Sequence, residues 1–383
     1  MNIAILGFGV VGGGVYNILN TASKRHLKAI QVTRIFTHPT KGLPMEISSM
    51  EDIVCDPDIS CVVETLGGIH PAYELICACL RHKKHVVSAN KAVIAKHLDE
   101  FLTLAKQHHV QFLFEASVGG GVPWLESIKK AKRIDTLQHF HGIFNGTSNY
   151  ILDCMTHQSL AFDKTLKSAQ TLGYAEANPS ADIDGYDVQN KIVISCAIAF
   201  DRFIDVDSIP IFTLRNITLE DIQYAKKHNY IIKYMGEATL RNHTIEACAM
   251  PYFISNTSLE ANTHNNYNIA SLYGNSIGKL SFYGQGAGSL PTANAIIQDI
   301  LNIRTAQLNT FSLTPASLDS SITKHNYIIR SDVAFVADNI RKQEVFSSYY
   351  YTFTNAITLQ TLHEMILPLK GSIWIAKIAN FKE

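Results

Sequence analysis

The sequence lacks the features that usually mark membrane-spanning, nucleic-acid-binding and disulfide-stabilised proteins. Its 33 basic residues equal its 33 acidic residues, so no excess charge favours a nucleic acid or an anionic membrane surface. No apolar run approaches the roughly 20 residues that a membrane helix needs. The seven cysteines are scattered, and Cys77 and Cys79 lack the second pair that a zinc site would contain. We therefore expect buried thiols in a reducing compartment.

A basic leader is also missing, because the chain opens directly on the strand-like run MNIAILGFG. The expectation is a cytoplasmic protein with neither a nucleic-acid nor a membrane partner. The 383 residues are 46% hydrophobic and 17% charged, which is typical of a globular chain of two or three domains.

Short apolar runs alternate with helical ones over the first hundred and some residues. Runs such as NIAILGFG, IQVTRIFTH and CVVETLGG predict strands, and stretches such as PAYELICACLRHKK predict the helices between them. This alternation predicts an α/β fold with a Rossmann-type, doubly wound parallel sheet, which we place at residues 1–121. A second α/β domain is expected at 122–310, with its last helix, near 290–310, returning to the first domain. A small α+β module is expected at 325–383.

A glycine-rich loop follows the first predicted strand. Gly7, Gly9 and Gly12 fit the pattern G-x-G-x-x-G between a strand and a helix, which is the context that dinucleotide binding requires. Gly7 permits the tight turn, Gly9 lets a pyrophosphate approach the backbone, and Gly12 lets helix and strand pack closely. The intervening residues of this candidate cofactor site are Phe8, Val10 and Val11.

The end of the second predicted strand bears on the choice of dinucleotide. NAD enzymes usually carry an acid there for the ribose diol, whereas this chain reads RIFTHPTK. His38 and Lys41 are candidates for binding a 2′-phosphate, although either residue also fits a solvated loop. The sequence thus favours NADP over NAD.

The run GYAEANPSADIDGYDVQNKIVIS, residues 173–195, combines four acidic side chains with one lysine. A helix that begins near Tyr186 would place Asp187 and Lys191 on one face, at positions i and i+4. An ordinary surface ion pair is the simpler reading. However, the residues after Lys191 are apolar all round, which predicts a buried helix and a lysine suited to proton transfer. Asp182 and Asp184 are candidates for positioning the loop, and helix N-capping is the simpler account of both.

Four further stretches stand at predicted ends of strands or starts of helices. They are SANKAVIA, FEASVGGGVP, GIFNGTSNYIL and SFYGQGAGSLPTANAII. Each alone fits a surface lysine, a turn, an N-cap or a linker. Together with the 173–195 run and in this order, they closely resemble homoserine dehydrogenases over roughly Asn2–Thr310.

That resemblance implies a nucleotide-binding domain, a catalytic and dimerisation domain, and the NAD(P)-dependent interconversion of L-homoserine and L-aspartate 4-semialdehyde. It places the protein in threonine, methionine and isoleucine biosynthesis, as a homodimer or higher homo-oligomer. It implies that Lys191 is the acid–base, that Lys91 is a second catalytic lysine beside the cofactor, and that Glu176 and Asp187 bind the substrate's ammonium group. Further cofactor-binding positions that it implies are Thr65, Gly173, Gly286 and Gly288. A sodium or other monovalent cation is expected on the backbone carbonyls of Glu115, Val118, Gly120 and Val122.

The chain also departs from the family pattern. Asn178 and Asn275 stand where relatives usually carry aspartate. The segment 325–383 resembles a shortened ACT-type regulatory module without the usual glycine turn after its first strand, which leaves open whether threonine is a feedback inhibitor. Two other functions fit the sequence less well, namely an NAD(P) dehydrogenase for another small amino alcohol or aldehyde, and a non-catalytic dinucleotide-binding regulator.

Overall fold

The computed structural model describes residues 1–37, 39–305, 313–369 and 371–379, which divide into two compact units. The first unit comprises Met1–Lys130, Val193–Phe203 and Gly284–Thr314. The second unit comprises the three intervening and following stretches, Ala131–Ile192, Ile204–Tyr283 and Pro315–Glu383. His38, a candidate for the 2′-phosphate site, lies outside the described residues.

The first unit is built on a six-stranded parallel sheet with the order β3-β2-β1-β4-β5-β6. This is the strand order of dinucleotide-binding doubly wound folds, so the predicted Rossmann-type sheet is confirmed. Four of the strands are almost continuously buried, as expected for parallel strands that are covered on both faces. The strands are β1 (Asn2–Leu6), β2 (Gln31–Phe36), β3 (Glu46–Ile47), β4 (Cys61–Glu64), β5 (His85–Ser88) and β6 (Phe112–Leu113).

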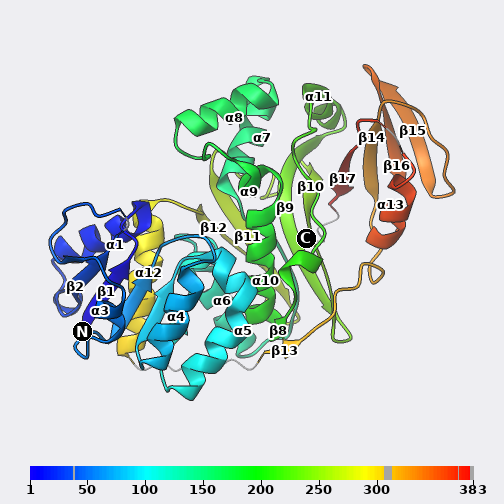
Figure 1. Ribbon diagram of the computed structural model, residues 1–383. Helices are drawn as coiled ribbons and strands as arrows, with labels where there is room; N and C mark the ends of the chain where they lie inside the picture. The colour runs from blue at the N-terminus through cyan, green and yellow to red at the C-terminus, as the bar shows by residue number, and fades with distance from the viewer. Residues whose placement is uncertain (38, 306–312, 370, 380–383) are drawn as a thin grey trace. The chain divides into compact units, whose positions relative to one another are not determined.

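Helices cover this sheet, and two of them are far apart in the sequence but packed together. α1 (Val10–Asn20) contacts α12 (Ser289–Arg304), and both lie beside β1 (Figure 1). The other helical segments of the unit are α2 (Arg25–Lys28), α3 (Glu51–Val54), α4 (Ala72–Arg81), α5 (Lys91–Gln107), the 3-10 turn η1 (Glu115–Ser117) and α6 (Trp124–Lys132). The short strands β8 (Arg202–Phe203) and β13 (Thr314–Pro315) pair with each other.

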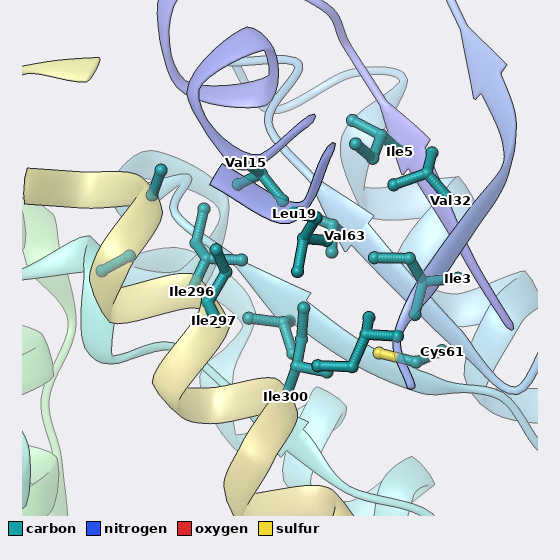
Figure 2. Packing of buried hydrophobic residues seen from close by; sticks show 14 of the residues in the cluster. Ile3, Ile5, Val15, Leu19, Val32, Cys61, Val63, Ile296, Ile297 and Ile300 are labelled. Carbon is teal, nitrogen blue, oxygen red and sulfur yellow. The ribbon is translucent and has the colours of Figure 1, made fainter. Parts of the chain in front are cut away.

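One core cluster of the first unit lies between the sheet and these two helices. Val15 and Leu19 of α1 meet Ile296 and Ile300 of α12 over the strand residues (Figure 2). Each buried aliphatic side chain of this kind stabilises a fold by about 1.5–3 kcal/mol relative to its exposed state. The contact fixes where the amino ends of both helices lie, which matters for the glycine loop described below.

The second unit is built on a nine-stranded mixed sheet with the order β12-β11-β7-β9-β10-β17-β14-β16-β15. β9 and β10 form an antiparallel hairpin over twelve positions, and β17 runs parallel to β10. The sheet therefore continues into the carboxyl-terminal strands. The strands are β7 (Leu137–Ile143), β9 (Tyr230–Arg241), β10 (Thr244–Ser255), β11 (Tyr267–Gly274), β12 (Gly278–Gln285), β14 (Tyr327–Ser331), β15 (Ile340–Phe346), β16 (Tyr349–Thr354) and β17 (Trp374–Ile378).

The helix α10 (Tyr186–Phe200) begins in the second unit and ends in the first. Every residue from Lys191 to Phe200 is buried, which confirms the prediction of a buried helix. The other helical segments are α7 (Gly146–Gln158), α8 (Phe162–Thr171), α9 (Ser180–Ile183), the 3-10 turn η2 (Val206–Ser208), α11 (Leu219–Lys227) and α13 (Leu359–Ile366). In the described part of the chain, each helix is too short or too polar to cross a bilayer.

The carboxyl-terminal segment adds four strands and one helix to the second unit. The residues between β14 and β15, 332–339, form bends and a turn but no helix. The chain then runs through the β15–β16 hairpin, α13 and β17.

Candidate active site

The glycine loop of the first unit joins β1 to α1 with an uncapped helix start. Gly7 has φ +92°, and its N–H donates to the carbonyl of Phe36 at 2.9 Å. Gly9 is the N-cap of α1 and supplies no side-chain hydrogen bond to the helix. Gly9 and Val10 are exposed, so the first N–H groups of α1 face solvent, where a phosphate is favoured.

Only glycine fits at two positions of this loop. A Cβ on Gly12 would lie 2.1 Å from the carbonyl oxygen of Gly7, and a Cβ on Gly7 would lie 2.7 Å from that of Thr65. The Thr65 hydroxyl donates to the Gly7 carbonyl at 2.7 Å. Thr65 therefore lies directly against the loop, next to the residues that the pattern identifies.

A second glycine-capped helix begins beside the first. Gly288, with φ +120°, is the N-cap of α12 and also lacks a side-chain cap. The hydroxyl of Ser289 donates to the Val10 carbonyl at 2.7 Å, and a Cβ on Gly14 would lie 2.7 Å from the Ser289 carbonyl oxygen. The amino ends of α1 and α12 thus meet at one edge of the unit.

The glycines of FEASVGGGVP pack against this same edge. A Cβ on Gly120 would lie 2.6 Å from the Gly286 carbonyl, and the Gly121 N–H donates to the Gln285 carbonyl at 3.0 Å. An open cavity of about 740 Å³ lies here. Its lining residues are Gly121, Gln285, Gly288, Ser289, Leu290, Pro291 and Asn294. The structure thus brings Gly120, Gly286 and Gly288 together beside the amino end of α1.

The turn of residues 115–122 was predicted to hold a monovalent cation. Glu115, Val118, Gly120 and Val122 are buried, and the Glu115 and Val122 carbonyls accept the N–H groups of Val118 and Trp124 at 3.3 and 2.8 Å. A carbonyl oxygen has a second lone pair, so these hydrogen bonds are compatible with a hard cation. The Glu115 carboxyl accepts the N–H groups of Leu125 and Glu126, and burial raises its pKa to about 8.

A buried polar network at the carboxyl ends of β4 and β5 positions the start of α5. Asn90 is the N-cap of α5, and its side-chain amide donates to Glu64 at 3.4 Å and to the Gly68 carbonyl at 2.6 Å. Ser88 also donates to Glu64. Burial raises the pKa of Glu64 although these donors oppose the shift. Lys91, the first residue of α5, is half-buried and follows this network directly.

The loop after β2 contains an acid that the sequence pattern did not indicate. Glu46, in β3, accepts hydrogen bonds from Thr37 and from the N–H groups of Lys41 and Leu43. The Thr37 hydroxyl and the loop N–H groups lower the pKa of Glu46 to about 2. The Lys41 ammonium donates to the Phe8 carbonyl at 2.7 Å. The Lys41 ammonium therefore lies against the glycine loop, while Glu46 holds the backbone of Lys41 and Leu43.

In the second unit, Asp187 and Lys191 form the predicted i,i+4 pair. The Lys191 ammonium lies 2.8 Å from the Asp187 carboxylate and donates to the Phe144 carbonyl at 2.6 Å. The side chains are only 9% and 3% exposed. The pair is therefore buried and is not the ordinary surface ion pair of the simpler interpretation. A desolvated lysine without such partners would not keep its charge.

Asn145 links this pair to the acidic loop. Its side-chain amide donates to Asp187 at 2.8 Å and to Asp182 at 2.7 Å, and its carbonyl oxygen accepts the Ser148 N–H at 2.7 Å. Asn145 is the N-cap of α7, so one side chain both starts a helix and orients two carboxylates. The sequence indicated only its position at a helix start.

The expectation that Asp182 and Asp184 act as N-caps is wrong. Asp182 lies inside α9, and Asp184 is the residue after that helix. Asp184 instead forms an ion pair with Arg215, at 2.6 Å, and accepts the Thr213 hydroxyl. These partners hold the loop before α10, and sequence reasoning missed them because Arg215 is distant in the chain.

Glu176 and Gly173 lie on the exposed segment between α8 and α9. Gln170 donates to the backbone carbonyl of Glu176 at 3.1 Å, while the side chain of Glu176 faces solvent. Gly173 has φ +76° and open space around it. Asp187 is buried, whereas Glu176 is accessible, so the two predicted ammonium ligands differ in environment.

The parallel sheet with its paired glycine-capped helices is typical of a dinucleotide-binding protein. Comparison with known proteins makes the class specific. The family described as "Homoserine dehydrogenase" matches residues 123–301, and "Homoserine dehydrogenase, NAD binding domain" matches residues 7–115. The chain belongs to the homoserine dehydrogenase family, which is a family of oxidoreductases.

Individual relatives agree with this assignment. The homoserine dehydrogenase of Synechocystis sp. is 40% identical over 316 residues, which cover 79% of this chain and 73% of that protein. The Bacillus subtilis homoserine dehydrogenase is 33% identical over 314 residues, which cover 79% and 72%. The crystal structure of a homoserine dehydrogenase from Thiobacillus denitrificans matches 100% of this chain and 99% of that one, with a TM-score of 0.91 and 30% identity.

Proposed function

We propose that this protein interconverts L-homoserine and L-aspartate 4-semialdehyde with NADP as its preferred cofactor, in the biosynthesis of threonine, methionine and isoleucine. The observation that carries the proposal is the buried Asp187–Lys191 pair in a chain of the homoserine dehydrogenase family. A bound nicotinamide dinucleotide supplies the hydride acceptor or donor. The residues of the chain bind the substrate and move the proton.

Lys191 is the proposed acid–base. In the oxidation of homoserine, the neutral amine of Lys191 takes the proton of the reacting hydroxyl and becomes the ammonium as the hydride leaves the same carbon. In the reverse direction, it returns that proton to the aldehyde oxygen. Asp187 and the Phe144 carbonyl hold the ammonium in one place, so the proton moves along a fixed direction.

Glu176 and Asp187 are the proposed partners of the substrate's ammonium group, and Lys91 is the proposed second cation at the reacting end. Glu176 is exposed and therefore accessible to a ligand from solvent. Asn145 orients Asp187 by donating to the same carboxylate oxygen that accepts from Lys191. Asn178 lies two residues after Glu176 in the sequence. Because its side chain is neutral, Glu176 supplies the negative charge at these positions.

The preference for NADP rests on Lys41. Its ammonium lies against the glycine loop and could pair with the negative charge of a 2′-phosphate. The nearby acid Glu46 already accepts hydrogen bonds from three protein donors. Gly7 to Gly12, Thr65, Gly173, Gly286 and Gly288 are the proposed cofactor contacts. A monovalent cation such as sodium is proposed on the 115–122 turn, and a homodimer in the cytoplasm is the proposed state.

The test is a steady-state assay of the purified protein with L-homoserine, run in parallel with NAD and NADP. We expect saturable turnover with homoserine and a higher kcat/KM with NADP. Two small alcohols, one without the carboxylate and one without the ammonium group of homoserine, serve as matched substrates, and we expect both to react poorly. A folded protein that binds NADP but turns over none of these alcohols would contradict the proposal, and faster turnover of another alcohol would replace homoserine as the substrate.

A further inference from the structure

The helix α7 carries a polar stripe whose far end is not used by the proposed reaction. Asn145, Asn149, Asp153 and His157 follow one another at intervals of four residues, which places them along one face of the helix. Asn145 orients Asp187 at one end of the stripe. At the other end, Asp153 and His157 meet a histidine from the segment before β11.

Both imidazole rings approach the same carboxylate oxygen of Asp153. Oδ1 of Asp153 lies 3.0 Å from Nδ1 of His264 and 3.4 Å from Nε2 of His157. The three ligand atoms lie within 4.8 Å of one another. Metal bonds of about 2.0–2.1 Å in a tetrahedral site hold ligand atoms roughly 3.3 Å apart, so two of the three separations already match such a site.

The second carboxylate oxygen of Asp153 is held by the backbone. Oδ2 accepts the N–H of Asn265 at 2.9 Å, which leaves Oδ1 directed at both imidazoles. A hydrogen bond to the oxygen that does not bind the metal is the usual way in which a carboxylate ligand is oriented. The donor set therefore consists of two imidazole nitrogens and one oriented carboxylate oxygen.

The two parts of the chain that carry the ligands are already fixed to each other. The side-chain amide of Asn149 donates to the carbonyls of Thr263, Asn265 and Tyr267, at 3.0–3.1 Å. The buried Lys233 ammonium donates to the Thr263 carbonyl and to the side-chain oxygen of Asn149. A ligand that binds here orders little additional chain, which favours affinity.

We propose that Asp153, His157 and His264 bind a divalent transition-metal ion of the zinc type. Two imidazoles with one carboxylate suit zinc and its neighbours better than magnesium or calcium, which prefer all-oxygen sites. His157 and His264 are 51% and 46% exposed, so the remaining position opens to water, and small rotations can bring the third separation to the required value. The ion would join the end of α7 to the segment that precedes β11.

The charge of Lys233 sets a limit on the affinity. Burial lowers the pKa of Lys233 to about 8, and the carboxylate of Asp153 acts in the opposite direction. Since Asp153 already interacts with this cation, we expect weaker binding than at structural zinc sites with four protein ligands. The proposal does not depend on the proposed dehydrogenase activity.

The experiment uses the full-length protein after treatment with a chelator. Zn²⁺ is titrated in competition with a chromophoric chelator, and Co²⁺ is added separately to record the visible absorption of tetrahedral Co²⁺. We expect one Zn²⁺ per chain, a tetrahedral Co²⁺ spectrum, and a melting temperature that rises with Zn²⁺ and falls again with chelator. His157→Gln and His264→Gln should each weaken binding by more than the roughly 10- to 100-fold that loss of an outer-shell partner causes.

The matched control is His70→Gln. His70 and Glu74 form an exposed i,i+4 pair at 2.6 Å that, among the described residues, belongs to no three-ligand group. This variant should bind Zn²⁺ like the wild type. The proposal is overturned if the wild type binds no Zn²⁺ under these conditions, or if His157→Gln and His264→Gln, shown to be folded by circular dichroism, bind Zn²⁺ as tightly as His70→Gln.

Discussion

Two buried acids of the first unit and two of the second lie in opposite electrostatic surroundings. In the first unit, burial raises the pKa of Glu115 to about 8 and that of Asp299 to about 7. In the second unit, burial acts in the same direction on Glu237 and Glu260, but the Lys377 ammonium lowers the pKa of Glu237 to about 2, and the hydrogen bond from His141 lowers that of Glu260 to about 2. Glu115 and Asp299 are thus favoured in their neutral form, whereas Glu237 and Glu260 are favoured in their charged form.

The difference follows from the partners that each acid meets. Glu237 pairs with Lys377, and Glu260 accepts His141 and pairs with Lys279 at 3.0 Å. Asp299 instead accepts the backbone N–H of Glu115 at 2.9 Å. In the first unit, backbone N–H groups at helix ends are the groups that can meet a ligand. In the second unit, charged side chains are. That division suits a phosphate-rich cofactor on one unit and proton transfer on the other.

The largest expected effect is at the buried pair of the second unit. Lys191→Met should lower kcat by about 10²- to 10⁴-fold with little change in NADP affinity, because proton transfer is lost while the glycine loop is intact. The assay is turnover of L-homoserine together with fluorescence titration of NADPH. Lys377→Met is the matched control, since it removes another buried lysine from an ion pair in the same unit. Equal losses in both variants would show that burial, and not proton transfer, explains the effect.

A second test asks whether the charge of Glu237 stabilises the second unit. Its folded pKa, about 2, lies below the ordinary 4.5, so its stabilisation is present above pH 4.5 and is lost as the pH falls toward 2. Glu237→Gln should destabilise the unit by about 3–5 kcal/mol at neutral pH and remove this acid dependence. Urea unfolding in a Trp124→Phe background lets Trp374, which lies in the second unit, report the transition. An unchanged acid profile would contradict the assignment.

The first unit is tested through two adjacent glycines of α1. Gly12→Ala should weaken NADP binding by roughly 100-fold, because the new Cβ would lie 2.1 Å from the Gly7 carbonyl oxygen and displace the loop. Gly13→Ala is the control, since its Cβ would lie 3.8 Å from the ring of Phe8. Alanine in a helix interior is favoured over glycine by about 0.5–1 kcal/mol, so this variant should bind NADP normally and unfold at a higher temperature. Similar binding by the two variants would show that the loop tolerates displacement.

The same contrast separates what the sequence could predict from what it could not. The Rossmann-type sheet was predictable because strand alternation and the glycine loop are local patterns, and the 187–191 pair was predictable because helical spacing is local too. The network of Glu64, Ser88 and Asn90 was not predicted, although a polar residue after each apolar strand was a usable signal. Its recognition requires that β4 and β5 be neighbours, which depends on the whole sheet.

The capping error has the same origin. Asp182 and Asp184 have the residue type and position of N-caps, but a partner remote in the sequence competes for each carboxylate. Asn145 takes Asp182, and Arg215 takes Asp184. The sequence likewise did not indicate that His264 lies beside Asp153 and His157. The spacing of Asp153 and His157 within α7 is local, whereas the position of His264 depends on the turn before β11.

A smaller effect is expected for the neutral acids of the first unit. Burial raises the folded pKa of Glu64 above 4.5, so its contribution to stability is present below pH 4.5 and is lost as the pH rises through the raised value. Glu64→Gln, which resembles the neutral acid, should therefore leave stability at low pH nearly unchanged and reduce its decline at higher pH. A Trp374→Phe background isolates Trp124 of the first unit as the probe. A variant that is instead less stable at high pH would indicate that Glu64 is ionised when folded.

The smallest expected effect concerns the choice of cofactor. Lys41→Ala should raise the KM for NADP severalfold and leave the KM for NAD unchanged, because an exposed lysine contributes modestly to binding a phosphate. Lys28→Ala removes a lysine from the end of α2 in the same unit and serves as the control. Raising the salt concentration should shrink the difference between Lys41→Ala and the wild type, since screening weakens an exposed contact. If KM rises equally for NAD and NADP, then Lys41 acts by supporting the Phe8 carbonyl of the glycine loop, and the 2′-phosphate is bound elsewhere.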